Sequence, residues 1–315
     1  MGLRCDVKFE CPSKRFAMWK RVLLSFMLVA PATLVAQSHD GMAGMAMHDH
    51  AAQSLSAAAK KQIDSVARRA APFATTAAAT NAGFRPVFGW IPTMGQHWVD
   101  RALMAREKQL ELGAPANLMF SKIGGRDSLV GVAYAYFAPL ADSAPPRLFD
   151  GAPAWHEHPN LAPPGERLVM LHVWFVPSPD GAFAGTNPNL PFWAAGLSAP
   201  DSARMRTDSA FNGRVRRASL ALAEVTDTTS IFANLERRPE LQPALAVHRD
   251  SIRAIVAELR AAEKAKDTAR WDRELDRAAA QWDAIYAAYL ASARTSQGKE
   301  RMERYVDMLL GHHEG

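Results

Sequence analysis

The chain has 315 residues, of which 48% are hydrophobic, with 37 Lys and Arg against 32 Asp and Glu. A chain of this length and composition can bury a substantial core, in one large domain or in two. The small excess of positive charge, without a basic patch, argues against a nucleic-acid partner.

Residues 1–37 have the organisation of a leader. A basic Met-Trp-Lys-Arg stretch precedes an apolar run from Val22 to Ala36 that ends in small residues. Such a pattern is typical of a secretory signal peptide. The run is short and interrupted by Pro31, which does not suit a stable membrane span. We therefore expect translation to start at Met18, cleavage after Ala36 or Gln37, and a periplasmic or extracellular protein without a membrane span. An uncleaved N-terminal anchor is the alternative.

Cleavage would change the charge and the sulfur chemistry of the chain. It would remove six Lys and Arg, two Asp and Glu, and both cysteines, Cys5 and Cys11. The mature chain would keep 31 basic and 30 acidic residues, a net charge of about +1. Without cysteine, it would have no disulfide, no thiolate ligand and no cysteine nucleophile.

Residues 38–54 form a small-residue segment rich in Met and His. Thioether and imidazole groups are ligands that suit copper, especially Cu(I). The segment resembles the metal-collecting tails of periplasmic copper proteins, which implies a second, weaker metal site; a linker of drifted composition is the alternative. The candidate ligands are His39, Met42, Met45, Met47, His48 and His50.

Residues 55–82 are predicted to form a helix and a linker. The helix is expected over 55–71, because Leu55, Ala59, Ile63 and Val66 line one side and Pro72 closes it. An Ala- and Thr-rich linker follows.

Residues 83–199 are predicted to form a β-rich domain. The composition changes there to Gly, Pro and aromatic residues, with apolar runs separated by turn signals. A Gly-Gly-Arg-Asp turn is expected to join the first two strands as a hairpin. The predicted strands are 117–123, 128–139 and 167–177.

Residues 200–315 are predicted to be helical. Apolar residues recur at spacings of three, four and seven, which is typical of core-facing helix stripes. Because helix and strand patterns do not alternate, we predict an α+β protein: an antiparallel β sandwich or barrel-like domain followed by a C-terminal helical segment of unassigned role. The predicted helices are 202–224, 227–238, 240–266 and 267–295, the last two as a hairpin.

Four of the ten histidines lie in the β-rich stretch. On a strand, His156 and His158 would point the same way, with Glu157 opposite. His172 lies in an apolar strand, and His97 follows a Met-Gly pair that suits a tight turn. Because converging imidazoles most often share a metal ion, we predict that these four histidines form one site for Zn or Cu.

Other roles stay open for the same residues. His172 would also suit a hydrogen-bonded core position. His97 would also suit a structural pair with Asp100 at a loop–helix junction. Glu157 would serve as a general base only if it faced a metal-bound water, whereas the strand pattern favours a surface or supporting role.

Three motifs resemble those of a group of uncharacterised bacterial secreted proteins. They are Pro92-Thr-Met-Gly-Gln-His-Trp-Val99, Trp155-His-Glu-His158, and the Leu171-His-Val-Trp strand that leads into Pro179-Asp-Gly181. The resemblance covers residues 83–197 and excludes the helices. It implies that the four histidines belong together, and it implies no activity.

Three functions follow from this pattern. The first is a secreted or periplasmic metal-binding protein of unassigned activity. The second is a metalloenzyme in which three histidines leave an open position for water or oxygen. The third is a structural or ligand-binding secreted domain without metal. The sequence leaves catalysis and protein partners undetermined.

Overall fold

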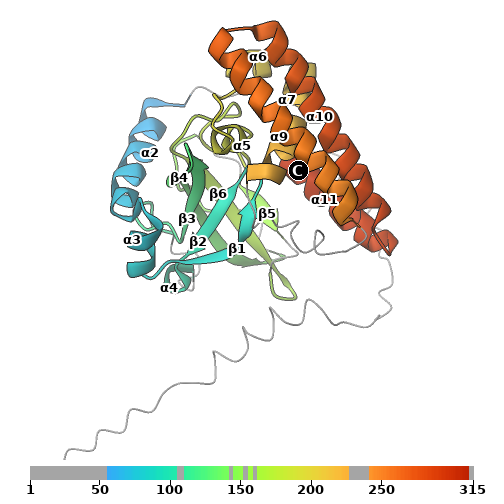
Figure 1. The fold of residues 1–315 in the computed structure, drawn as a ribbon. Coiled ribbons are helices and arrows are strands. Elements are labelled where there is room, and N and C mark those ends of the chain that lie inside the picture. Colours follow the sequence, from blue (N-terminus) through green and yellow to red (C-terminus); the bar gives the residue numbers. More distant parts are fainter. Residues whose placement is uncertain are drawn as a thin grey trace, which may run out of the picture. The chain divides into compact units, whose positions relative to one another are not determined.

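The computed structural model describes residues 55–104, 110–141, 145–151, 155–158, 162–226 and 241–311 (Figure 1). These residues all belong to one compact unit. The predicted leader, the Met- and His-rich segment with its six candidate ligands, and the helix predicted at 227–238 lie outside the described residues.

Six strands form one antiparallel sheet in the order β1-β2-β3-β4-β6-β5 (Figure 1). The predicted strands 117–123, 128–139 and 167–177 correspond to β3, β4 and β6, and the α+β class is confirmed. The bounds are β1 Arg85–Ile91, β2 Gly95–Val99, β3 Asn117–Ile123, β4 Arg126–Pro139, β5 His156–His158 and β6 Glu166–Trp174.

Two N-terminal helices pack on one face of the sheet. The predicted first helix is α2 Ala57–Ala70, which Ser56 caps by accepting a hydrogen bond from the Ala59 amide at 3.0 Å. A short 3-10 turn and α3 Thr76–Asn81 follow where a linker was expected. The apolar cluster on this face joins Val66, Ala70 and Ala79 of the helices to Leu118, Phe120, Val132, Tyr134, Leu171 and Val173 of the strands.

The C-terminal helices bury a second core, as their apolar stripes predict. The helix predicted at 202–224 is two helices, because Asp208 is extended and caps the second one by accepting from the Phe211 amide at 2.9 Å. The last helix was not predicted. The helices are α4 Arg101–Met104, α5 Asn189–Ala194, α6 Ser202–Thr207, α7 Ser209–Thr226, α9 Gln242–Ala265, α10 Thr268–Ala291 and α11 Ser296–Leu310.

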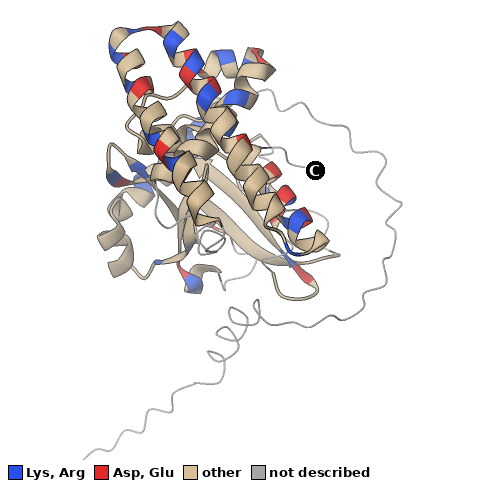
Figure 2. Cartoon of the chain, turned by 45° about the vertical axis from the view of Figure 1, so that its right-hand side comes forward, with Lys and Arg blue, Asp and Glu red and all other residues tan. Residues whose placement is uncertain are grey.

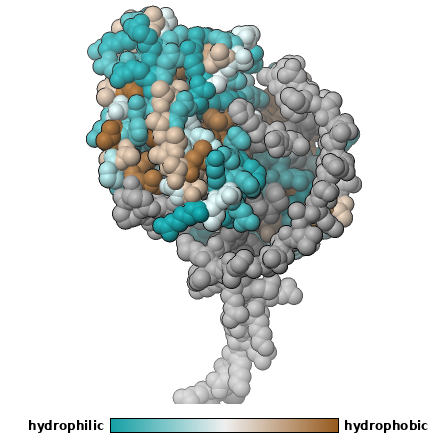
Figure 3. Space-filling view, turned by 90° about the vertical axis from the view of Figure 1, so that its right-hand side faces the viewer, coloured by the Kyte–Doolittle hydropathy of each residue, from teal (hydrophilic) through white to brown (hydrophobic). Residues whose placement is uncertain are grey.

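Charged residues follow the outer faces of these helices, and few of them lie on the strands (Figure 2). The surface over the helices is correspondingly mostly hydrophilic, with scattered hydrophobic residues (Figure 3). Among the described helices, none combines the length and the apolar character that crossing a membrane requires.

Candidate functional site

All four predicted histidines lie on one face of the sheet. Residues directly opposite in antiparallel strands point to the same face. His97 in β2 is opposite Met119 in β3, and His172 in β6 is opposite Ala133 in β4. On the other side of β6, His156 in the edge strand β5 is opposite Met170, and His158 lies two residues further on the same face.

The four rings form a contiguous cluster. Nε2 of His97 lies 3.2 Å from Nε2 of His172. The His172 ring is 4.8 Å from the His156 ring, centroid to centroid, and His156 is 4.9 Å from His158. Residues that are 75 positions apart in the chain therefore meet through the sheet.

His97 and His172 come from strands that are not neighbours. Strands β3 and β4 separate the two histidine strands, so a flat sheet would place their backbones about 14 Å apart. The two rings therefore lean toward each other across β3 and β4. The face of β4 between them carries the small residues Gly131, Ala133 and Ala135.

Hydrogen bonding fixes the tautomer of His172. This residue is fully buried, and its Nδ1 lies 2.7 Å from the carbonyl oxygen of Gly185. A carbonyl only accepts, so Nδ1 holds the proton and Nε2 presents its lone pair to His97. His97 is 5% exposed, and its buried Nδ1 has no hydrogen-bond partner among the described residues.

Burial keeps both central histidines uncharged. It lowers the pKa of His97 to about 4, and the nearby His158 acts in the same direction. Burial also lowers the pKa of His172 well below its ordinary value; His156 and His97 add to this, and the Gly185 hydrogen bond opposes it. At neutral pH both imidazoles are therefore uncharged, and the uncharged imidazole is the form that binds metal ions.

Two of the four histidines are already spaced as two ligands of one metal ion would be. Two nitrogen ligands of one tetrahedral ion, each about 2.0–2.1 Å from it, lie about 3.4 Å apart, close to the 3.2 Å between the Nε2 atoms of His97 and His172. Among the described residues, no three His, Cys, Asp or Glu side chains are arranged to hold one ion. A third imidazole would have to come from His156 or His158 by rotation of its half-buried ring.

The acidic residues considered beside the histidines lie elsewhere. Glu157 is exposed and pairs with Arg167 at 3.2 Å, as the strand pattern predicts. Asp100 does not pair with His97. Its carboxylate caps α4 by accepting from the Ala102 amide at 2.8 Å.

The sequence interpretation missed the two methionines on the histidine face. Met119 is fully buried and Met170 is 8% exposed, and both belong to the apolar cluster of this face. The position of Met170 two residues before His172 would have placed it on the same face. Met119 has no such signal, because its place depends on the register between β2 and β3.

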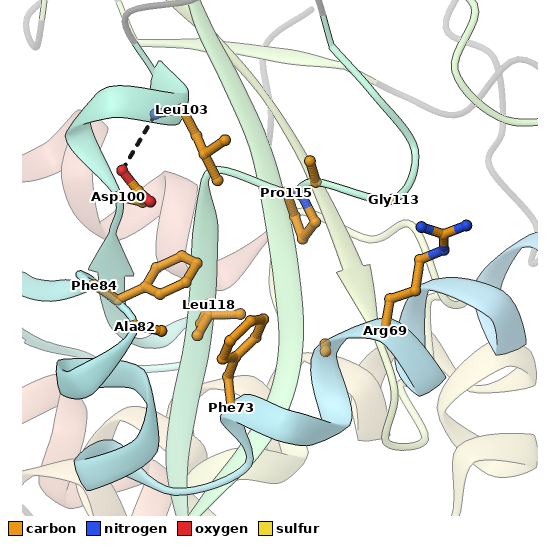
Figure 4. A pocket seen from close by; sticks show the side chains of 11 residues that line it. Arg69, Phe73, Ala82, Phe84, Asp100, Leu103, Gly113, Pro115 and Leu118 are labelled. Atoms are coloured by element: carbon orange, nitrogen blue, oxygen red, sulfur yellow. Dashed lines mark hydrogen bonds between the residues drawn. The ribbon is translucent and has the colours of Figure 1, made fainter.

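A separate pocket of about 200 Å³ lies on the opposite face of the sheet (Figure 4). Leu118, which neighbours Met119 and points the other way, contributes to its apolar lining with Phe73 and Phe84. Arg69 and Asp100 also border it, but the Asp100 carboxylate is engaged by the amides of α4 (Figure 4). None of the four histidines lines this pocket.

In comparisons with known proteins, the chain matches no protein-family model, no curated protein and no solved structure.

Proposed function

We propose that this chain is a secreted or periplasmic protein that binds a transition-metal ion through His97, His156, His158 and His172. The observation that supports this most directly is the His97–His172 pair, with its Nε2 atoms 3.2 Å apart in a buried setting. The Gly185 carbonyl orients the His172 ring as outer-shell hydrogen bonds orient metal ligands in proteins. The leader sequence supports the location.

One further feature favours metal binding over a purely structural role. The exposure of the rings rises from His172 and His97 to the half-buried His156 and His158 in the edge strand. An ion would therefore reach the buried nitrogens from the side of β5.

Metal binding without hydrolysis is the form of the proposal that the geometry favours. A hydrolytic metalloenzyme needs a base beside the metal-bound water. Glu157, the acid between the two edge histidines, points away and is paired with Arg167. An open position for oxygen, as in the metalloenzyme alternative, would lie on the side of β5.

Metal uptake by the full chain tests the proposal, provided that other ligands are silenced. We define the tail-silent chain as the full chain with Cys5 and Cys11 changed to Ser and with six residues changed to Ala: His39, Met42, Met45, Met47, His48 and His50. After exposure to Zn²⁺ or to Cu²⁺ and exhaustive dialysis, elemental analysis is expected to find about one ion per chain.

Two single variants locate the ion. His158→Gln alters a half-buried edge position and is expected to lower metal affinity about tenfold or more. His248→Gln is the matched control, because His248 lies on α9 and bonds Gln281 of α10 at 2.8 Å. No uptake by a folded tail-silent chain, or equal losses in the two variants, would overturn the proposal and favour the metal-free alternative.

A further inference from the structure

Two methionines share the face of the sheet that carries the four histidines. Met119 lies directly opposite His97 across β2 and β3, and Met170 lies directly opposite His156 across β6 and β5. Cβ atoms of such cross-strand pairs are about 4.5–5.5 Å apart. Each methionine therefore lies beside a histidine of the cluster, on the same face.

Both methionine side chains are buried on this face of the sheet. They pack in one apolar group with Ala133, Ala135 and Trp174. The methyl carbon of Met119 fits over Gly131, where a Cβ atom would come within 2.6 Å of it. This contact turns the Met119 side chain along the face of the sheet that carries the histidines.

We infer that the metal of this cluster is copper, bound as Cu(I) by imidazole nitrogens together with a thioether sulfur of Met119 or Met170. The inference rests on the proposed function and names its metal. Thioether sulfur is a soft donor that selects Cu(I), whereas Zn²⁺ is bound in proteins by thiolate, imidazole and carboxylate.

Burial favours a monovalent ion for a separate reason. Imidazole and thioether are neutral ligands, so the charge of the ion is not compensated by its donors. The solvation cost of burying a charge grows with the square of that charge, so Cu(I) loses about a quarter of what a divalent ion loses at the same site. The carboxylate of Glu166, at the start of β6, is too far away to compensate the charge, because it lies six residues or about 20 Å along the strand from His172.

The arrangement of donors agrees with a mixed site. Among the described residues, no three His, Cys, Asp or Glu side chains gather around one point. Two imidazoles already lie at ligand-like separation. A thioether would add a further donor to these two and to the imidazole that His156 or His158 would supply.

The test measures both metals on the same proteins. In the tail-silent chain, Met119 and Met170 are changed together to Leu, which conserves volume and apolar character. Cu(I) affinity is measured without oxygen, with ascorbate, by competition against a chromogenic Cu(I) chelator. Zn²⁺ affinity is measured by competition against a chromogenic zinc indicator. Met205→Leu is the matched control, because Met205 is 2% exposed in the helical core.

The double variant is expected to lose about tenfold or more in Cu(I) affinity while its Zn²⁺ affinity stays unchanged. The control should match the parent for both metals. If the double variant keeps its Cu(I) affinity, the inference fails while the proposed function stands. If the parent binds neither metal, the proposed function itself fails.

A second measurement does not depend on how the variants fold. The tail-silent chain is produced with selenomethionine and loaded with Cu(I), and X-ray absorption is recorded at the copper edge. A selenium atom is expected in the first coordination shell beside nitrogen. A shell of nitrogen alone would overturn the thioether assignment.

Discussion

The hydrogen bond from His172 to Gly185 determines which ring nitrogen is available for chemistry. Nδ1 donates its proton to the Gly185 carbonyl, so only Nε2 is left to face the cluster. The neighbouring carbonyl of Ala184 accepts from the Trp174 indole at 2.6 Å. The segment that contains Ala184 and Gly185 thus orients both rings of the His-Val-Trp strand. The Pro-Asp-Gly turn before this segment reverses the chain and brings the two carbonyls back to the strand.

The lowered pKa of His97 predicts a dependence of stability on pH. An unfolded histidine titrates near 6.5, whereas folded His97 titrates near 4. Between these values the unfolded state binds more protons, so the free energy of unfolding falls as the pH falls from about 6.5 to about 4. For His97 alone the total loss is about 3 kcal/mol.

Urea unfolding between pH 7.5 and pH 4.5, with a chelator present, measures this effect. His97→Gln is expected to flatten the dependence, although His172 contributes in the same direction. His248→Gln should keep the dependence of the parent. Parallel curves for His97→Gln and the parent would show that His97 is not the group responsible.

At the scale of elements, the sequence predicts what local patterns control. The long apolar strands β3, β4 and β6 and the helical hairpin of α9 and α10 follow from hydrophobic runs and spacings. Pro86, Gly89 and Pro92 obscure β1 and β2, because such residues usually interrupt strands. The last helix was missed although Thr295 caps it by accepting from the Gly298 amide at 3.0 Å.

The candidate site was predictable only in part, for a related reason. The i, i+2 spacing of His156 and His158 is a local signal and places both on one face. That His97 meets His172, and that Met119 lies beside them, depends on how distant strands pair. In a hairpin such as β3–β4 the turn helps to set the register. The pairing of strands that are far apart in the chain, such as β4 with β6, depends on long-range contacts that no local pattern specifies.

The close packing at Gly131 in β4 predicts that the stability of the fold is sensitive to a single methyl group added there. A Cβ atom at position 131 would lie 2.5 Å from the carbonyl oxygen of Val173 and 2.6 Å from the Met119 methyl. The backbone oxygen belongs to the neighbouring strand and cannot turn away. Gly131→Ala is therefore expected to reduce the free energy of unfolding by about 1–3 kcal/mol.

Gly213→Ala is the matched control for this substitution. Gly213 lies within α7, and its Cβ would meet only the Arg217 guanidinium at 3.8 Å. Alanine there is expected to raise the free energy of unfolding by about 1 kcal/mol, because it favours the helix. Urea unfolding of both variants compares the two; equal effects of the same sign would contradict the close packing at β4.

At the scale of the whole folded unit, α5 joins the sheet to the helices. Leu190 packs into the apolar cluster of the histidine face, and Phe192 packs into the helical core. The Ser219 hydroxyl of α7 donates to the Pro188 carbonyl at 2.9 Å, just before α5 begins. Helix α5 thus lies on the histidine side of the sheet, on the face opposite α2 and α3, and connects that face to the helical core.

An ion pair makes a second connection between the two parts. Nη2 of Arg216 in α7 donates to both carboxylate oxygens of Asp180 at 2.7 Å, and its Nε donates to Asn212 at 2.9 Å. The Arg216 side chain is 10% exposed, and its guanidinium packs under Gly311 at the end of α11. Asp180 belongs to the Pro-Asp-Gly turn, so this pair ties the turn after the histidine strand to two helices.

Asp180→Asn is expected to destabilise the whole folded unit and not the turn alone. It keeps the shape of the side chain but leaves the buried Arg216 guanidinium without its counter-charge, at a cost of about 1–3 kcal/mol. Asp276→Asn is the matched control, because the Arg214–Asp276 pair is more exposed and is expected to contribute at most about 1 kcal/mol.

Urea unfolding followed by far-UV circular dichroism and by tryptophan fluorescence measures both variants. In Asp180→Asn the two signals should shift together to lower urea; a shift of one signal alone, or equal losses in the two variants, would show that the pair does not couple the sheet to the helices.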